Sequence, residues 1–370
     1  MTAPIQPPDP AAPALLGMPP AELERVTNAL ALPRYAAKQL ADWMYKKFAP
    51  SFDAMSNISK NGRAALAEHT LLGASAPENT ASASDGTKKY LFRTLDDHFV
   101  ESVYIPEEDR ATLCLSTQAG CRMGCRFCMT ARQGLEAQLA PADILNQYYS
   151  LPERGEISNI VYMGMGEPLD NLDAVLASIA ALTAPWGMAM SPRRITVSTC
   201  GILAGLERLL AETEVHVALS LHNPFDTERA RLMPVALREP LEPIFALLKR
   251  YNWRGQRRLT LEYMLFEGYN DNEDHRKQLV RLTGGLGNVR VNLLAWNPLP
   301  AVAPQLQDHA KPDAQSRSLT LAPASLSALE DFQAHLNAAG VIAPVRRSRG
   351  GDIASACGLL STQNKTVGKG

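Results

Sequence analysis

Three of the six cysteines in this 370-residue chain fall within eight residues, at Cys121, Cys125 and Cys128, in the stretch CRMGCRFC. Three thiols at this spacing could form disulfides, bind zinc or bind a redox-active metal cluster. A structural zinc ion takes four ligands, commonly as two close pairs, and the sequence offers no second C-x2-C or H-x3-H pair. Zinc is therefore disfavoured, and the choice between disulfides and a cluster depends on the redox compartment.

The N-terminal stretch MTAPIQPPDPAAPALLGMPP lacks the basic and apolar regions of a signal peptide, and no apolar run approaches the ~20 residues that span a bilayer. We therefore expect a cytoplasmic protein without membrane contact, in which thiols stay reduced. Three thiolates in one loop suit a [4Fe–4S] cluster with one iron left open. Such an iron can bind the amino and carboxylate groups of S-adenosylmethionine (SAM) and pass an electron to its sulfonium, which releases a 5′-deoxyadenosyl radical.

A series of short β-branched runs alternates with helical patterns after residue 107. Each run is separated from the next by a stretch with helical periodicity, which indicates a parallel sheet. Six units fall short of the eight of a closed barrel, so we predict an α/β fold built as an open partial (βα)6 barrel. Chemistry in such folds lies at the carboxyl ends of the strands, and the three cysteines follow the first strand. The runs are ATLCLST, SNIVYMG, RRITVST, EVHVALSL, RLTLEYML and NVRVNLLAW.

The remaining segments differ in pattern. Apolar residues at helical spacing predict a small helical N-terminal domain, and alternation in KKYLFRTLDDHFVESVYIP predicts a β-hairpin after a turn-rich linker. A long proline-containing loop, a helix and a short strand follow the barrel. The predicted divisions are a disordered lead-in (1–18), the helical domain (19–75), the linker and hairpin (76–106), the barrel (107–300), the loop, helix and strand (301–350), and a loop with Cys357 that ends in a disordered tail (351–370).

Longer motifs surround these elements in the order VESVYIPEEDRATLCLSTQAGCRMGCRFC, GMGEPLDN, ITVSTCG, ALSLH, WNPLP and RGGDIASACG. In these motifs the chain, from about residue 72 to residue 360, resembles the radical SAM superfamily and, more narrowly, the RlmN family of rRNA adenine-C2 methyltransferases. The resemblance implies a [4Fe–4S] cluster on Cys121, Cys125 and Cys128, SAM as a second cofactor, and 23S rRNA as a substrate before full ribosome assembly. It also implies a monomeric enzyme with an electron donor such as flavodoxin and its reductase, and it leaves tRNA open as a second substrate.

The resemblance assigns catalytic roles as well. Cys357 would carry a methyl group from one SAM molecule, Glu101 would remove the C2 proton, and Cys114 would release the RNA by forming a disulfide with Cys357. A strand cysteine such as Cys114 could equally be a core filler, and Glu101 on an exposed hairpin could be a surface charge. Strand alternation places Cys114 with Thr112 and Ser116 on one polar face, which favours a functional thiol.

The same match assigns the SAM contacts. The backbone of Gly166 and Glu167, in a glycine-rich turn after the second strand, would hold the SAM amino group. Cys200 matches no family cysteine and is interpreted as structural, and Phe127, between two ligands, is expected to shield the cluster. Without the match, His222 would be interpreted as a hydrogen-bonded structural histidine. The other SAM contacts that the match assigns are Ser198, Ser220, Leu221, His222 and Asn297.

The net charge of −1 gives no global sign of a nucleic-acid partner. Basic residues do stand beside aromatic ones in KQLADWMYKKF (38–48) and gather near the C-terminus at Arg346, Arg347 and Arg349. Such patches suit contact with an RNA backbone, and each taken alone also suits a solvated surface. We predict RNA contacts in both places.

Two departures from the family pattern bear on the substrate: Gly351 and Ala354 stand where relatives often carry acids, and the loop 301–323 is longer and less aromatic than usual. Two other functions stay open. One is an adenine-C8 methyltransferase of the Cfr type. The other is a non-catalytic RNA-binding protein with a structural metal, which would be colourless and bind zinc. A second, auxiliary cluster would have only scattered cysteines as ligands, namely Cys114, Cys200 and Cys357.

Overall fold

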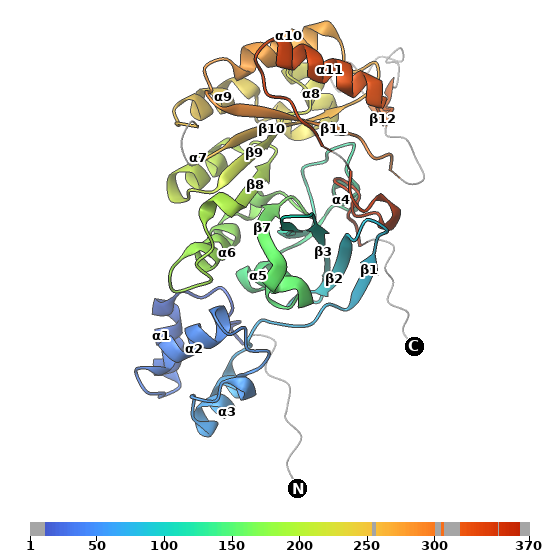
Figure 1. The fold of residues 1–370 in the computed structure, drawn as a ribbon. Coiled ribbons are helices and arrows are strands. Elements are labelled where there is room, and N and C mark those ends of the chain that lie inside the picture. The colour runs from blue at the N-terminus through green and yellow to red at the C-terminus, as the bar shows by residue number, and fades with distance from the viewer. Residues whose placement is uncertain (1–11, 254–256, 300–304, 307–318, 347, 363–370) are drawn as a thin grey trace.

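The computed structural model describes residues 12–253, 257–299, 305–306, 319–346 and 348–362. Within these residues the largest sheet has the strand order β1-β2-β3-β4-β7-β8-β9-β10-β11-β14 (Figure 1). Its two edge strands, β1 and β14, do not pair with each other, so the sheet stays open. The strands are β1 (Asn79–Ser82), β2 (Lys88–Arg93), β3 (Phe99–Pro106), β4 (Ala111–Cys114), β7 (Ile157–Tyr162), β8 (Ile195–Thr199), β9 (His216–Ser220), β10 (Leu259–Leu265), β11 (Val289–Ala295) and β14 (Val345–Arg346).

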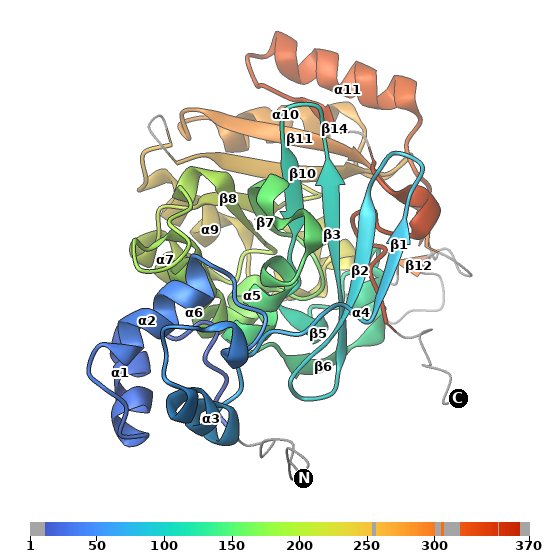
Figure 2. The ribbon, with the colours of Figure 1, turned by 60° about the horizontal axis from the view of Figure 1, so that its bottom comes forward.

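The predicted partial barrel is confirmed. Its six β-branched runs form β4, β7, β8, β9, β10 and β11, which are neighbours in this order and parallel throughout. Helices between the strands cover the outer side of the sheet (Figures 1 and 2). They are α5 (Pro141–Tyr149), α6 (Leu172–Thr183), α7 (Leu203–Glu212), α8 (Asp226–Leu232), α9 (Leu241–Lys249), α10 (Glu273–Thr283) and α11 (Leu326–Ala338).

Strand β10 shows how the sheet separates its two faces. Leu261 and Tyr263 are fully buried on the outer face, and Tyr263 stacks on Phe332 of α11. Glu262 and Met264 alternate with them and therefore point to the inner face. Burial of each large apolar side chain on the helix-covered side contributes about 1.5–3 kcal/mol. Helix α7 supplies a matching apolar stripe at the spacing of one helix face, formed by Leu206, Leu209 and Leu210. Polar side chains are thus left on the inner face.

The predicted helical segment contains α1 (Pro20–Ala29), α2 (Ala36–Tyr45) and α3 (Lys60–His69). It packs on the barrel through aromatic side chains, with the Tyr45 ring 5.3 Å from that of Trp186 and the Tyr149 hydroxyl donating to the Ala49 carbonyl. The prediction that residues 1–18 are disordered is wrong for Leu15 and Leu16. Both leucine side chains are buried in the core, and their N–H groups donate to the carbonyls of residues 71 and 72.

The predicted hairpin is present as β2 and β3, but it is more than a linker. Strand β3 pairs antiparallel with β4, so the hairpin continues the barrel sheet. The turn-rich stretch before it also contains a strand, β1, which pairs antiparallel with β2. Its residues NTAS are mostly exposed and carry no apolar signal, so this edge strand depends on backbone pairing alone. The sequence analysis also did not predict the antiparallel pair of β5 (Gln118–Gly120) and β6 (Leu135–Gln138), two short strands that flank the three cysteines.

The part of the chain after β11 is described only in pieces. Short strands β12 (Gln305–Leu306) and β13 (Leu319–Thr320) pair within the predicted 301–323 loop, most of which, like Arg347 and the predicted tail from 363, lies outside the described residues. The predicted C-terminal helix and short strand are α11 and β14, and β14 pairs in parallel with β11. Among the described residues, no helix is both long and apolar enough to cross a bilayer.

Candidate active site

The cluster loop, residues 121–128, lies between β5 and the short helix α4 (Met129–Gln133). Its entry requires glycine, because Gly120 has φ +74° and an added Cβ would meet the Gly134 carbonyl oxygen at 1.6 Å. Burial raises the pKa of Cys121 to about 12, and that of Cys125 lies well above its usual value, with the charges of Cys128 and Cys121 adding to the effect. The three sulfurs therefore face a common space, where a bound cation would relieve their mutual repulsion.

This donor set fits an iron–sulfur cube better than a single ion. In the described part of the chain, no three His, Cys, Asp or Glu side chains converge closely enough to hold one metal ion. In a [4Fe–4S] cube each cysteine binds a different iron, so the ligand sulfurs lie farther apart than around zinc. Three soft thiolates are what a cube with one open iron requires.

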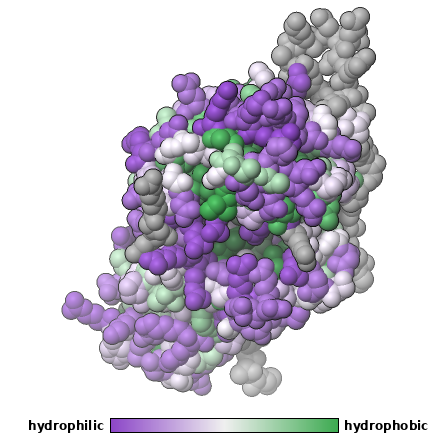
Figure 3. Space-filling view, turned by 45° about the horizontal axis from the view of Figure 1, so that its top comes forward, coloured by the Kyte–Doolittle hydropathy of each residue, from purple (hydrophilic) through white to green (hydrophobic). Residues whose placement is uncertain are grey.

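An apolar cluster surrounds the cluster loop. Phe127 is buried, its ring lies 6.1 Å from that of Phe266, and its carbonyl accepts a hydrogen bond from the Trp296 indole. On one face of the molecule, apolar surface lies recessed between hydrophilic rims (Figure 3). Such surroundings lower the local dielectric and limit the access of water to a redox centre. The members of this apolar cluster include Cys121, Met123, Phe127, Cys200, Met233, Met264, Phe266, Trp296 and Leu299.

His222 stands at the end of β9, against the cluster loop. Its ring lies 4.9 Å from the Phe127 ring, and its Nδ1 accepts a hydrogen bond from the Met264 N–H. Burial, followed by the charge of Arg229, lowers the pKa of His222 to about 3. The imidazole is therefore neutral at physiological pH with its proton on Nε2, and no described residue accepts that proton. His222 is both a structural histidine and a fixed donor.

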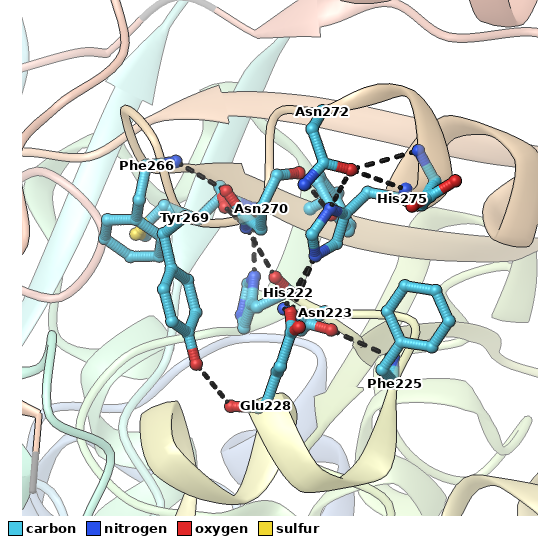
Figure 4. Close-up of polar contacts among 12 residues, drawn as sticks. His222, Asn223, Phe225, Glu228, Phe266, Tyr269, Asn270, Asn272 and His275 are labelled. Carbon is cyan, nitrogen blue, oxygen red and sulfur yellow. Dashed lines mark hydrogen bonds and ion pairs between the residues drawn. The ribbon is translucent and has the colours of Figure 1, made fainter. Parts of the chain in front are cut away.

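The backbone of His222 is held in an unusual conformation. Its φ of +54° lies in the left-handed region, which costs a non-glycine residue about 1–3 kcal/mol. The Asn270 amide offsets this cost by donating to the carbonyls of His222 and Met264 at 2.6 and 2.8 Å (Figure 4). The Asn270 amide oxygen in turn accepts from the Phe266 N–H. Asn270 thus joins the end of β9 to the end of β10.

A polar network also connects the end of β9 to helices α8 and α10. The Glu228 carboxylate accepts from the Asn223 amide at 2.8 Å and lies 2.7 Å from Nε2 of His275 (Figure 4). His275 is buried, and its Nδ1 lies 2.8 Å from the Asn272 side-chain oxygen. Glu228 therefore connects the residue that follows His222 with the start of α10.

We expect Glu228→Ala to reduce the free energy of unfolding by about 1–3 kcal/mol, because the Asn223 amide and His275 lose their acceptor. The same variant should bind SAM more weakly, since the turn after β9 is less fixed. Urea denaturation and isothermal titration with SAM measure the two effects. Glu242→Ala, at an exposed position in the first turn of α9, is the matched control. Wild-type stability in Glu228→Ala would contradict a supporting role for the network.

Arg229 is a central residue of the site that the sequence analysis missed. It is fully buried, and its guanidinium donates to the carbonyls of Cys200, Ser220 and Leu221 at 2.6, 3.1 and 3.1 Å. Burial lowers the pKa of Arg229 from its usual value, and the nearest acidic group, Cys200, opposes that effect. One side chain thus ties together the carboxyl ends of β8 and β9.

Replacing Arg229 by methionine should cost at least about 3 kcal/mol of unfolding free energy, because several buried carbonyls lose their donor at once. Arg238→Met, at an exposed position, should change stability by less than about 0.5 kcal/mol. Guanidinium denaturation followed by circular dichroism compares the two variants. Equal stabilities would show that water or other donors replace Arg229.

Gly166 and Glu167 lie where the predicted SAM turn requires them, after β7. Gly166 has φ +101°, and a Cβ there would meet Gln118 at 2.6 Å. The Glu167 N–H already donates to the Gln118 side chain and its carbonyl accepts from the Asp170 N–H, whereas no described residue donates to the Gly166 carbonyl. The Gly166 carbonyl is therefore the available backbone acceptor of this pair.

The Glu167 side chain has a role that the sequence analysis did not foresee. It is buried, and its carboxylate accepts from the N–H groups of Cys200 and Leu169 at 2.8 and 3.1 Å. Burial raises the pKa of Glu167, and these hydrogen bonds partly oppose the rise. Glu167 therefore stabilises the end of β8. The backbone of Cys200 contacts both the Glu167 carboxylate and Arg229, which is consistent with a structural role for Cys200.

The other predicted SAM residues line the carboxyl edge of the sheet. Ser198 and Ser220 are half-buried near the ends of β8 and β9, and Leu221 is fully buried beside His222. Asn297 follows β11, and its side-chain oxygen accepts a hydrogen bond from the Ser348 hydroxyl at 3.0 Å. With Gly166 and Glu167 after β7, the predicted SAM residues thus follow the ends of β7, β8, β9 and β11 in one sheet.

Glu101 and Cys114 lie on the paired strands β3 and β4, where Cys114 is opposite Val103, two residues after Glu101. Cys114 is buried, while Leu113 and Leu115 point to the opposite, helix-covered face, as strand alternation predicts. The Ser116 hydroxyl donates to the Glu101 carbonyl at 2.5 Å. The Glu101 side chain is fully buried, so the alternative of a surface charge is wrong, because the hairpin is part of the sheet.

The Cys357 loop, residues 354–361, closes over these two residues. Lys89 on β2 lies 3.3 Å from one Glu101 oxygen and donates to the Ala354 carbonyl, while the Ser361 N–H donates to the other Glu101 oxygen at 3.2 Å. Burial lowers the pKa of Lys89. Sequence analysis gave no role to Lys89, which here joins the predicted base to the loop with the predicted methyl carrier.

The Cys357 loop lies against the start of α4, because the Gly358 carbonyl accepts a hydrogen bond from the Met129 N–H. The Cys357 side chain is accessible to solvent, yet surrounding protein atoms desolvate the thiol and raise its pKa, with the charge of Glu262 as the next cause. Burial raises the pKa of Cys114 as well, and the Cys357 charge is the second cause of that rise. All six cysteines, Cys114 and Cys357 among them, are unpaired.

Comparison with known proteins agrees with this geometry. Residues 115–280 match the model of the Radical SAM superfamily, and residues 14–72 match the ribosomal RNA large subunit methyltransferase N-terminal domain. The crystal structure of a radical SAM methyltransferase from Sphaerobacter thermophilus is similar with a TM-score of 0.84 and 37% identity, over 94% of this chain and 99% of that one. The open barrel with its three-cysteine loop is that of a radical SAM enzyme.

Curated relatives narrow the family. The probable dual-specificity RNA methyltransferases RlmN of Bacteroides fragilis and Parabacteroides distasonis are 45% and 47% identical, over 94% of this chain and 96% of theirs. The dual-specificity RNA methyltransferase RlmN of Syntrophotalea carbinolica is 40% identical over 91% of this chain and 87% of its own. The chain belongs to the RlmN family of radical SAM methyltransferases, which use a [4Fe–4S] cluster and SAM. The alternative of a non-catalytic protein is thereby excluded.

Proposed function

We propose that this enzyme methylates C2 of an adenosine in 23S rRNA and of an adenosine in tRNA. The observation that best supports the proposal is the hydrogen bond from the Ser361 N–H, four residues after Cys357, to the carboxylate of Glu101, which lies on the strand next to that of Cys114. The relatives' name, dual-specificity RNA methyltransferase RlmN, supports RNA as the substrate and C2 over C8.

Adenine C2 is an electron-poor carbon without a nucleophilic lone pair, so it does not attack a methyl donor directly. When bound, the cluster and SAM supply a methyl group and the radical chemistry that activates it. In this proposal Cys121, Cys125 and Cys128 hold the cluster, and Phe127 shields it.

The protein's own residues divide the remaining work. Cys357 carries the methyl group on its sulfur, and its position on a loop lets that sulfur reach both the SAM site and the RNA base. Glu101 accepts the C2 proton, and the neighbouring Lys89 ammonium stabilises its ionised form. Cys114 then bonds to the Cys357 sulfur and frees the RNA, leaving a disulfide that must be reduced before the next turnover.

SAM is held along the rim of strand ends. We assign the Gly166 carbonyl to the SAM amino group, and the Nε2–H of His222 acts as a fixed neutral donor beside the cluster loop. The other SAM contacts in this proposal are Glu167, Ser198, Ser220, Leu221 and Asn297.

The RNA reaches the barrel mouth with its target base unstacked, since C2 must come close to the Cys357 sulfur. Lys38, Lys46 and Lys47 of the N-terminal helices are exposed, and Lys47 lies 3.8 Å above the Trp43 ring, a combination that suits backbone contact. Arg346 and Arg349, on β14 and just after it, would contact phosphates at the mouth. The enzyme acts as a monomer in the cytoplasm, with flavodoxin and its reductase as electron donor.

The test is to incubate anaerobically reconstituted enzyme with SAM, a reductant and protein-free large-subunit rRNA, or with tRNA, and to identify methylated nucleosides by mass spectrometry. We expect 2-methyladenosine from both RNAs, and none from Cys357→Ala, which should still form 5′-deoxyadenosine. Formation of 8-methyladenosine would transfer the enzyme to the Cfr type. Formation of 5′-deoxyadenosine without any methylated base would refute the RNA substrate.

A further inference from the structure

The turn between β1 and β2, residues 83–87, has no part in the function proposed above. It nevertheless contacts the chain just before the Cys357 loop, at residues 349–352, which are the RGGD segment of the motif RGGDIASACG. In Figures 1 and 2 the C-terminal part of the chain, drawn in red, lies beside the β1–β2 hairpin. The two segments are far apart in the sequence, so folding of the whole barrel is needed to bring them together.

Two aspartates make this contact reciprocally. On the turn, the Asp85 carboxylate accepts a hydrogen bond from the Gly350 N–H at 3.1 Å and forms an ion pair with Arg349 at 3.8 Å. On the RGGD segment, the Asp352 carboxylate accepts a hydrogen bond from the Ser84 N–H at 2.9 Å. Each aspartate therefore binds the backbone of the other segment, and we refer to this pair of contacts as the clasp.

Gly350 is the residue at which the RGGD segment packs most tightly on the turn. Its φ is +60°, and an added Cβ would meet the Ser355 hydroxyl at 1.9 Å and the Thr87 side chain at 2.9 Å. The Gly350 carbonyl accepts hydrogen bonds from the N–H and the hydroxyl of Ser355 at 3.0 and 2.9 Å. Ser355 lies two residues before Cys357, so Gly350 connects the clasp directly to the Cys357 loop.

Helix α4 holds the other end of the Cys357 loop. The Thr130 hydroxyl donates to the Leu360 carbonyl at 2.7 Å, and the Gln133 side-chain oxygen accepts from the Thr362 N–H at 3.0 Å. Because α4 directly follows the cluster loop, this end of the Cys357 loop is fixed relative to the three cysteines. The methyl carrier of the proposed function thus lies between one attachment on α4 and a second attachment on the β1–β2 turn.

We propose that Asp85 and Asp352 are positioning residues for the methyl carrier, because their clasp fixes the start of the Cys357 loop. The proposal rests on the proposed role of Cys357. Neither aspartate touches the reacting atoms, and both act through the backbone of the segment before Cys357. A displacement of about 1 Å can slow a reaction about 100-fold, so loss of one attachment should affect the transfer of carbon to RNA. The cluster loop makes no hydrogen bond to either aspartate among the described residues, so SAM cleavage should continue.

The experiment compares wild type, Asp85→Ala and Asp352→Ala as reconstituted holoenzymes with SAM, a reductant and protein-free large-subunit rRNA. Mass spectrometry gives the ratio of methylated adenosine to 5′-deoxyadenosine. We expect this ratio to fall at least about tenfold in both alanine variants, because a displaced sulfur transfers its carbon less often for each SAM cleaved. Both aspartates are exposed, so the fold should survive their replacement.

Two further variants show whether the lost hydrogen bond is the cause. Asp352→Asn keeps an acceptor oxygen for the Ser84 N–H and should restore most of the wild-type ratio. Asp96→Ala removes an exposed aspartate from the next turn, between β2 and β3, and should match the wild type. SAM binding is measured in parallel, since the proposed SAM contact Asn297 is hydrogen-bonded to Ser348, just before the RGGD segment.

A second measurement needs neither SAM nor RNA. The N–H groups of Gly350 and Ser355 are hydrogen-bonded, and their exchange with deuterium can be followed by mass spectrometry in a peptide that covers residues 348–356. We expect exchange in this peptide to be at least about tenfold faster in Asp85→Ala and Asp352→Ala, because the segment opens locally once a hydrogen bond to a carboxylate is lost. Iron content and melting temperature should stay at wild-type values.

The outcomes are distinct. Unchanged exchange in both alanine variants would show that the turn does not hold the loop, and it overturns the proposal. Faster exchange with a wild-type ratio also overturns it, because the carrier then works without the clasp. A parallel loss of SAM binding and of 5′-deoxyadenosine overturns it as well and makes the aspartates supports of the SAM site. A wild-type enzyme that forms 5′-deoxyadenosine but no methylated base refutes the proposed function, and the positioning role is refuted with it, whatever the exchange rates.

Discussion

The Cys114→Ala enzyme should become covalently attached to its RNA during the first turnover. Once the carbon on the Cys357 sulfur has bonded to adenine C2, the carbon–sulfur bond must break before the RNA is released. In our proposal this happens when the Cys114 sulfur bonds to the Cys357 sulfur. The substitution removes one buried sulfur from the end of β4 and leaves the packing of Leu113 and Leu115 unchanged. We therefore expect a folded, cluster-containing protein that stops after one event.

A denaturing gel measures the attachment as a slowly migrating band that nuclease treatment removes. Mass spectrometry should then find a nucleotide remnant on the Cys357 peptide. Cys200→Ala is the matched control, because Cys200 is also buried but its backbone contacts Glu167 and Arg229. Continued release of methylated RNA by Cys114→Ala, with no adduct, would refute the resolving role.

Cys121→Ala should lose the iron–sulfur cluster and all SAM cleavage together. Cys121 is one of the three cysteines of residues 121–128 that we propose as cluster ligands. Two thiolates do not retain a cube whose remaining irons would be open to solvent and reductant.

Iron analysis and the broad absorbance at about 400 nm measure the cluster, and 5′-deoxyadenosine measures SAM cleavage. Cys200→Ala again serves as control, since both cysteines belong to the same apolar cluster. A Cys121→Ala protein with full iron content and wild-type absorbance would disprove the ligand assignment. Loss of iron with normal SAM cleavage would be equally incompatible with it.

The barrel and its chemistry could be read from the sequence because their signals are local. Six β-branched runs separated by helical periodicity define β4 and β7–β11 without further information. The three cysteines are diagnostic because few sites use three thiolates in eight residues. Edge elements lack such signals: β1 is a polar run that becomes a strand only when β2 is available for pairing.

Site residues that act through distant contacts could not be found from local patterns. Only the family resemblance assigned a role to Glu101, because its local sequence also suits a surface charge until β3 pairs with β4 and the Cys357 loop contacts its carboxylate. Arg229 belongs to a short charged stretch of α8, and nothing in that stretch reveals that its guanidinium reaches three strand-end carbonyls.

The order of synthesis gives the Cys357 loop a further consequence. A ribosome completes all six central strands and the cluster loop before it adds residues 354–361, and domains generally begin to fold from the N-terminal side during synthesis. The inner face of the nascent barrel therefore stays uncovered above Glu101 and Lys89 until the end of translation. A chain that terminates early would keep the three cysteines proposed as cluster ligands and lack the proposed methyl carrier, so we expect truncation to give a protein that consumes SAM without modifying RNA.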